Sequence, residues 1–227
     1  LRFLFCNDNI LDSLDISPIQ FLLDLKCCNQ AEGFILHLTK EQKSRFTEKN
    51  YCNAILHYIE FPELITEPQL KKWIKANKDK LSGVIVNEDG GITGTKINLE
   101  ALAKIEILDC SESKLISINE LIRHMPNLKI LKCFYNKLTS LDLSKNINLE
   151  ELNCHWNQLS YLDISKNINL TGLNCSKNIL SSLDLKKSIK LDSLTCFINQ
   201  LTSLDLSKNI ELTYLSCSYN KLTSLDV

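Results

Sequence analysis

Cysteine is the residue type whose number and spacing most suggest chemistry in this chain of 227 residues, which holds ten of them. Five recur at intervals of 21 residues, namely Cys133, Cys154, Cys175, Cys196 and Cys217. Cys6 and Cys27 share this spacing, and Cys110 precedes the series by 23 residues. Zinc sites and disulfide frameworks use short, unequal spacings such as C-x-x-C. One cysteine per period instead predicts a small buried side chain at a repeated core position, which leaves only Cys28 and Cys52 outside the series.

Aspartates repeat with the same period and could suggest calcium: Asp142, Asp163, Asp184, Asp205 and Asp226. A calcium ion needs several converging oxygen ligands, and the glycine-rich turns of calcium-binding repeats are missing from this sequence. The four histidines lie far apart: His37, His57, His124 and His155. No H-E-x-x-H, G-x-S-x-G or P-loop motif occurs. We therefore expect no metal, no cofactor and no catalytic centre, and predict that the chain is not an enzyme.

The composition argues against two further classes of protein. The chain is 44% hydrophobic and 23% charged, with a net charge of −1, and it shows none of the basic stripes typical of nucleic-acid binders. No run approaches the roughly 18 consecutive apolar residues that a membrane-spanning helix requires. We expect neither nucleic-acid binding nor insertion into a membrane.

The elements that position these residues follow from one frame, L-x-x-L-x-C-x-x-N-x-L-x-x-L-D-[LI]-S-x-N, which recurs in five successive copies over residues 128–227. This frame resembles that of the leucine-rich repeat family, and its cysteine ladder is similar to that of a bacterial internalin with 21-residue repeats. The resemblance implies an α/β leucine-rich repeat solenoid. It has a curved parallel sheet on the concave face, helices outside the longer repeats and short 3₁₀ or extended segments outside the 21-residue repeats.

The match extends to the first residues, so we predict one solenoid of about ten repeats over 1–227, irregular over 1–127 and regular over 128–227. The triplet Leu1, Leu4, Cys6 and its successor at Leu25 follow the frame, and we predict degenerate copies starting at Ile55 and Leu81. The chain begins and ends within a repeat, so we expect it to be a fragment of a longer protein.

Several segments of the longer repeats carry helix signals. Thr39 can cap a helix that extends to about Ala54, and Thr66 with Pro68 can start another. Shorter helical turns are predicted over 98–104 and 119–125. An alternative is that residues 39–80 form a small helical domain inserted between two repeat arrays.

Each repeat position has a predicted role. The x-L-x-C segment is a strand whose Leu and Cys point inward, and the Asn that follows it satisfies backbone groups of its own repeat and the next. The third, fifth, seventh and eighth residues of each copy then face outward or lie at the sheet rim. Six of the seven aromatic residues in 128–227 fall there. The partner-binding residues predicted from this pattern are Phe134, Tyr135, His155, Trp156, Phe197, Ile198, Tyr214 and Tyr219. Alternatively, the aromatic rings only stack along the rim.

Three functions remain open. The first is a virulence-associated bacterial recognition module that binds a host or partner protein through the concave face. The second is the substrate-recognition arm of a secreted effector enzyme, such as a ubiquitin ligase, whose catalytic domain is not in this chain. The third is a purely structural or adhesive array. We expect export from a bacterium, either by injection into a host cell or by display on the surface.

Overall fold

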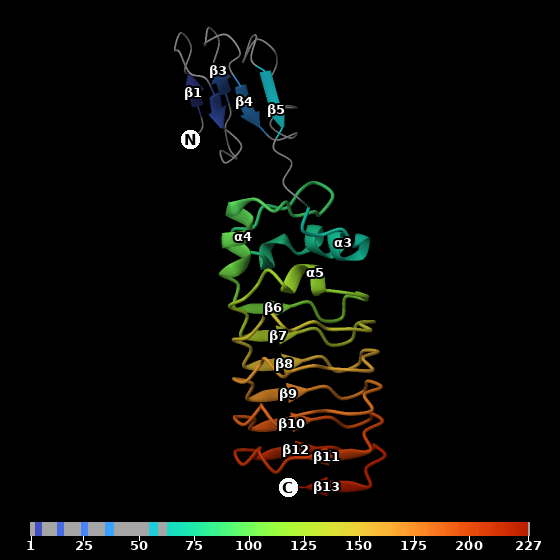
Figure 1. Ribbon diagram of the computed structural model, residues 1–227. Coiled ribbons are helices and arrows are strands. Elements are labelled where there is room, and N and C mark those ends of the chain that lie inside the picture. The colour runs from blue at the N-terminus through green and yellow to red at the C-terminus, as the bar shows by residue number, and fades with distance from the viewer. Residues whose placement is uncertain are drawn as a thin grey trace. The chain divides into compact units, whose positions relative to one another are not determined.

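The computed structural model describes residues 63–226 and, before them, five short strands (Figure 1). These are β1 (Phe3–Phe5), β2 (Ser13–Asp15), β3 (Asp24–Lys26), β4 (Ile35–Leu38) and β5 (Ile55–Tyr58). Side chains are described for 63–95 and 98–225. The chain divides into two compact units, one made of Leu1–Pro62 with Gly94–Ile97 and the other of Glu63–Thr93 with Asn98–Val227.

The first unit contains two small parallel sheets. Strands β1 and β3 pair with Leu4 opposite Leu25, as the 21-residue spacing predicts. Strands β2, β4 and β5 form the other sheet, in which Leu14, Leu36 and Leu56 are in register. The predicted copy starting at Ile55 is therefore wrong in register, because its strand aligns with the S-L-D segment of the first repeat. Cys6, Cys27, Cys28 and Cys52, and the helix predicted to end near Ala54, lie outside the described residues.

The second unit begins with helices, which are α3 (Pro68–Ala76), the 3₁₀ turn η1 (Lys78–Lys80), α4 (Lys96–Ala103) and α5 (Asn119–Ile122). Helix α3 starts at Pro68 as predicted, but its N-cap is Glu67, whose carboxylate accepts hydrogen bonds from the two backbone N–H groups of Gln69 and Leu70. Thr66, the predicted cap, instead bonds to Glu120. No strand forms in the predicted copy starting at Leu81, where the chain turns.

Six parallel strands follow in chain order and form one sheet. They are β6 (Ile107–Asp109), β7 (Ile130–Lys132), β8 (Glu151–Asn153), β9 (Gly172–Asn174), β10 (Ser193–Thr195) and β12 (Tyr214–Ser216). Their central leucines are in register, and Figure 1 shows the coils stacked one beneath another. A second pair, β11 (Ser203–Asp205) and β13 (Ser224–Asp226), aligns the S-L-D segments of the last two copies. The parallel solenoid with 21-residue spacing is confirmed.

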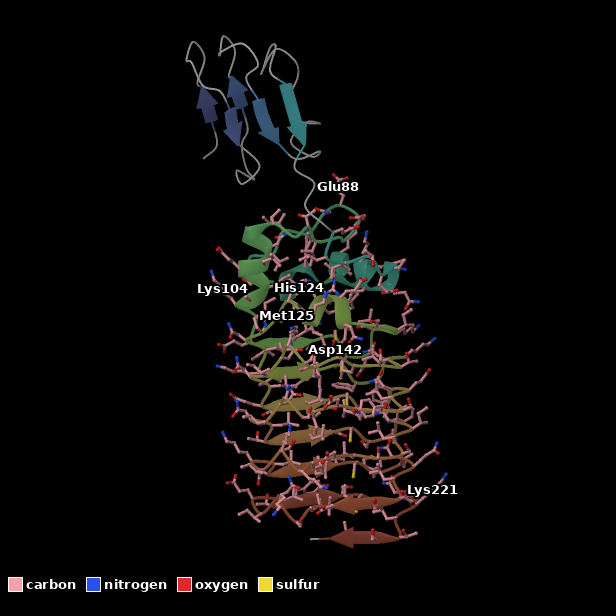
Figure 2. All side chains as sticks on the ribbon, in the orientation of Figure 1. Glu88, Lys104, His124, Met125, Asp142 and Lys221 are labelled. Atoms are coloured by element: carbon pink, nitrogen blue, oxygen red, sulfur yellow. The ribbon has the colours of Figure 1, made fainter. Side chains whose placement is uncertain are left out.

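The core of the array is a set of leucine columns beside one column of thiols. Cys110, Cys133, Cys154, Cys175 and Cys196 are buried and free, whereas Cys217 in the last coil is half-buried. The yellow sulfur atoms in Figure 2 lie one beneath another within this stack. Burial raises the pKa of the Cys154 thiol to about 12, so it stays protonated and unreactive at neutral pH. The prediction that these cysteines fill the core is confirmed for the described coils.

Asparagines connect each coil to the one before it. The Asn157 side-chain amide donates to the carbonyl oxygens of Cys133 and Cys154, both at 3.0 Å, and its oxygen accepts from the Leu138 N–H. Equivalent contacts recur at Asn136, Asn178, Asn199 and Asn220. The prediction that this side chain reaches its own repeat is confirmed, but its other partners lie in the preceding repeat and not in the next.

The repeated aspartates act locally. Asp142 accepts a hydrogen bond from the Ser144 N–H at 3.0 Å, and Asp163 accepts from Ser165 in the same way. These are two-residue turns closed by the carboxylate. Within the described residues, no three His, Cys, Asp or Glu side chains gather in a group that could hold a metal ion.

Candidate functional site

The exposed sheet face, defined as the third, fifth, seventh and eighth residues of each copy, is built by the strands and the turn that follows them. In strand β8 the central Leu152 is buried while Glu151 is exposed and Asn153 half-buried. The next residue inward is Cys154, after which His155 and Trp156 come to the surface. The alternation of a pleated strand therefore places the predicted site residues outward, as expected.

The eighth residue of each of the five copies in 128–227 has a left-handed backbone, which the sequence did not reveal. Tyr135, Trp156, Lys177, Ile198 and Tyr219 have φ angles between 51° and 57°. This conformation costs an L-residue about 1 kcal/mol or more, and it suits Gly or Asn far better than an aromatic or β-branched side chain. Backbone hydrogen bonds between coils hold it, for example from the Trp156 N–H to the Ser176 carbonyl at 3.1 Å.

Four side chains of the exposed sheet face form one aromatic cluster: Phe134, Tyr135, His155 and Trp156. The rings of Phe134 and His155 stack with centroids 4.8 Å apart, and those of Tyr135 and Trp156 stack at 4.7 Å. Tyr135 also meets the edges of Phe134 and His155. Stacking along the rim is therefore present, yet Tyr135 and Trp156 remain 45% and 43% exposed.

His155 is held in place by two neighbours. Its Nδ1 lies 2.6 Å from the Asn153 side-chain oxygen, and its ring lies on Phe134. Partial burial, and secondarily the positive charge of Lys177, lower the pKa of His155 below its ordinary value. A neutral ring at pH 7 follows, so the aromatic cluster itself carries no charge.

Lys177 extends the aromatic cluster toward Phe197 and was not among the predicted binding residues. Its ammonium lies 4.0 Å from the centroid of the Trp156 ring and 5.9 Å from that of Phe197. The sequence shows Lys177 in the same column as Tyr135 and Trp156, and this column was the signal that could have identified it.

The remaining predicted site residues are exposed but separate from the cluster. Ile198, Tyr214 and Tyr219 are 42%, 56% and 81% exposed. Among the described residues, no ring contact joins Tyr214 or Tyr219 to the aromatic cluster. The structure thus brings together Phe134, Tyr135, His155 and Trp156 and links Phe197 to them through Lys177.

A second exposed apolar column lies away from the sheet and was missed by sequence analysis. It consists of one isoleucine per coil, 52–89% exposed: Ile147, Ile168, Ile189 and Ile210. Its signal was the isoleucine that follows the second Asn of the frame, or Ser188 where serine replaces that Asn. We also find that no helix among the described residues is long and apolar enough to span a bilayer.

Comparison with known proteins gives likenesses in structure only. No family model matches the sequence, and no curated protein matches it. The functional domain of InlJ from Listeria monocytogenes, which includes a cysteine ladder, is 26% identical with a TM-score of 0.52; the match covers 100% of this chain and 43% of that one. The internalin InlF of the same organism is 25% identical with a TM-score of 0.58, covering 72% of this chain and 45% of its own.

A leucine-rich repeat protein of Leptospira interrogans is similar in fold alone, at 15% identity and a TM-score of 0.51 over 93% of this chain and 68% of that one. This chain spans less than half the length of the two internalin structures. The fold is an α/β leucine-rich repeat solenoid, and its structural neighbours are bacterial internalins and other leucine-rich repeat proteins. The internalin neighbours support a role in protein–protein interaction in general.

Proposed function

We propose that this leucine-rich repeat solenoid is the recognition module of an exported bacterial protein and binds a host or partner protein through its exposed sheet face. The aromatic cluster at Phe134, Tyr135, His155 and Trp156 is the anchor of the contact. The observation that carries the proposal is the left-handed eighth residue, because Tyr135 and Trp156 occupy a backbone position where Asn would fit with less strain. Strain retained in favour of a large exposed side chain is typical of functional sites.

The contacts within the aromatic cluster suit such an anchor. Stacked rings lose little side-chain entropy on binding, because the neighbouring rings already restrict their rotamers. Tyr135 and Trp156 still present nearly half of their surface to solvent. Trp and Tyr are the residues most often found as binding hot spots. Rim stacking and partner binding are therefore compatible here, and the first prepares the second.

A second candidate function is the substrate-recognition arm of a secreted effector enzyme such as a ubiquitin ligase. A purely structural or adhesive array is the third. The full-length gene distinguishes these candidates. A surface anchor or a signal for export supports a displayed or secreted module, whereas an adjoining catalytic domain supports the effector arm.

The binding proposal is tested by a pull-down from host-cell surface proteins with three baits: wild type, Trp156→Ala and Lys186→Ala. Lys186 is exposed on the turn after Asp184 and lies outside the exposed sheet face. We expect a partner retained by wild type and by Lys186→Ala, with at least about tenfold weaker affinity for Trp156→Ala in a titration. Equal affinity of wild type and Trp156→Ala for every retained protein contradicts the proposal.

A further inference from the structure

Lys177 carries a positive charge that has no ion-pair partner within the part of the chain whose side chains are described. No carboxylate of residues 63–225 lies within 4.0 Å of its ammonium, which contacts the rings of Trp156 and Phe197. Other partly buried lysines of the second unit are paired: the Lys71 ammonium lies 2.7 Å from Glu63 and 3.1 Å from Asp89. Lys177 is half-buried as a residue.

In the copy that contains Lys177 and in the two copies after it, the exposed sheet face carries no Asp or Glu. At the exposed sheet face, strands β9, β10 and β12 and their following turns carry only neutral side chains apart from Lys177 itself. These neighbours are Gly172, Asn174, Ser176, Ser193, Thr195, Phe197, Ile198, Tyr214, Ser216, Ser218 and Tyr219. His155, on the other side, is also uncharged at pH 7. Glu151 in β8 and Lys132 in β7 are the other charged side chains of the exposed sheet face in copies 128–225, at third and fifth positions. Among the eighth residues of these copies, Lys177 alone is charged.

We propose that Lys177 determines specificity by receiving an Asp or Glu side chain of the partner protein. The two aromatic rings hold the ammonium by cation–π attraction and fix its position without neutralising it. A carboxylate that docks there forms an ion pair while the partner's neighbouring groups cover Trp156 and Tyr135 and exclude water. An ion pair in such a water-excluded site is stronger than one in solvent. The partner segment is therefore acidic at one position and apolar beside it.

The left-handed backbone fixes the position of Lys177 at the rim, as it does that of the eighth residue in the other copies of 128–227. Lys177 has φ 53°, and its N–H donates to the Phe197 carbonyl at 2.9 Å, so the residue is locked at the rim between two rings. Lysine has no special tolerance for this conformation, whereas Asn does. This inference rests on the proposed function, since it names the chemistry of the partner at the same surface.

The test uses a library of random peptide loops displayed on a small folded scaffold. Four immobilised proteins select from it in parallel: wild type, Lys177→Met, Lys177→Arg and Trp156→Ala. Met keeps the length and apolar stem of Lys177 without the charge, and Arg keeps the charge. Lys186→Met is the matched control for loss of a lysine elsewhere. Thermal melting of each variant checks that it is folded before selection.

We expect loops selected by wild type, Lys177→Arg and Lys186→Met to be enriched in Asp or Glu next to aromatic or aliphatic residues. Lys177→Met should lose the acidic enrichment and keep the apolar one. A loop selected by wild type should bind Lys177→Met at least about tenfold more weakly at 150 mM salt. Its binding can be followed by the change in Trp156 fluorescence. The other tryptophan of the chain, Trp73, is only 7% exposed, so its emission should not change when a loop binds.

The experiment distinguishes a result that contradicts the role of Lys177 from one that contradicts the proposed function. Loops that depend on Trp156 but show no acidic enrichment, or that bind Lys177→Met as tightly as wild type, overturn the role of Lys177 and leave the proposed function standing. Selection that is the same for wild type and Trp156→Ala, or that enriches nothing, overturns the proposed function and the inference with it.

Discussion

The regular array over residues 128–226 and the helical segment over residues 63–127 differ in how polar contacts hold their parts together. In the array, one asparagine contact is repeated in every coil, as at Asn157 and Asn178. In the helical segment each contact occurs once. Glu67 caps α3, and Glu120 accepts hydrogen bonds from Thr66 and Glu67. Lys71 joins Glu63 to Asp89.

This difference means that in the array one set of residues determines stability and another set is free to serve binding. In the array, the frame residues are set by packing on the coil before and after, so the free energy of unfolding is close to a sum over neighbours. The exposed positions are then free to vary without loss of the fold. In the helical segment, a single substitution removes a contact that no neighbouring copy duplicates. Predictions that compare the two regions follow, beginning with the largest effect.

The largest effect is expected from Leu173→Asp in the middle of the array. Leu173 is 2% exposed and lies opposite Leu152 and Leu194 in the sheet. A buried carboxylate without a partner costs on the order of several kcal/mol, so the neighbouring coils should unfold with it. Thermal unfolding followed by circular dichroism measures the loss, and Ser181→Asp at an exposed site of the same repeat should cause little change. Similar melting of Leu173→Asp and wild type contradicts the assigned register.

Much of the array could be predicted from sequence, because a frame of period 21 specifies which residues face inward. The buried cysteines, the strand register and the outward placement of His155 and Trp156 follow from alternation alone. The helical segment has no such period. There the N-cap of α3 is Glu67 and not the predicted Thr66. The longer carboxylate of Glu67 reaches the free N–H groups of the first turn, while Thr66 is hydrogen-bonded to Glu120.

The next effect is expected at Glu120, where the helical segment depends on one carboxylate. It accepts from the Thr66 N–H at 2.7 Å, the Glu67 N–H at 3.0 Å and the Thr66 hydroxyl. Burial alone raises its pKa, but these hydrogen bonds together with the positive charge of Arg123 outweigh burial and leave the pKa below its ordinary value of 4.5. Glu120→Gln should lower the free energy of unfolding at pH 7 by about 1–2 kcal/mol, because a neutral acceptor forms weaker hydrogen bonds.

The effect of Glu120→Gln should depend on pH in a defined direction. Since the pKa of Glu120 is depressed in the folded state, its contribution is complete above about pH 5 and is lost as pH falls through the folded pKa. The difference between wild type and Glu120→Gln in urea unfolding should therefore shrink below about pH 4. Glu88→Gln, at an exposed carboxylate labelled in Figure 2, is the control and should change little at either pH. A difference that grows on acidification contradicts the assignment.

A smaller effect, of opposite sign, is expected at an irregularity within the array. Asn167 and Asn209 each donate to two carbonyl oxygens of the preceding coil. Ser188 stands at the equivalent place, and its buried hydroxyl has no hydrogen-bond partner among the described residues. Ser188→Asn should restore the donation to the Asn167 carbonyl and raise the free energy of unfolding by about 1 kcal/mol, with its side-chain oxygen left unpaired as it is at Asn167 and Asn209. Ser182→Asn at an exposed position is the control. A destabilised Ser188→Asn contradicts the equivalence of the coils.

The candidate site was predictable in its position but not in its geometry. Sequence periodicity placed Tyr135 and Trp156 at the rim, yet the rings that touch depend on backbone angles that no side-chain pattern reveals. The left-handed eighth residues stand in one column, in which the Lys177 ammonium lies 4.0 Å from the ring centroid of Trp156, the eighth residue of the preceding copy. The column of eighth residues could have identified Lys177 as a site residue, but its contact with the Trp156 ring is visible only in the structure.

The smallest effect is expected at Ile198, where the demands of fold and function oppose each other. Ile198 has φ 51° and is 42% exposed, and a β-branched side chain is among the least suited to this backbone. Ile198→Asn should raise the free energy of unfolding by about 0.5–1 kcal/mol while it removes apolar surface beside Phe197. Ile179→Asn is the matched control, because Ile179 is 49% exposed with an ordinary backbone and should give no gain. If both variants gain equally in denaturant unfolding, backbone strain is not the cause. If Ile198→Asn alone gains and also weakens binding to the exposed sheet face, the strained column is retained for recognition rather than for stability.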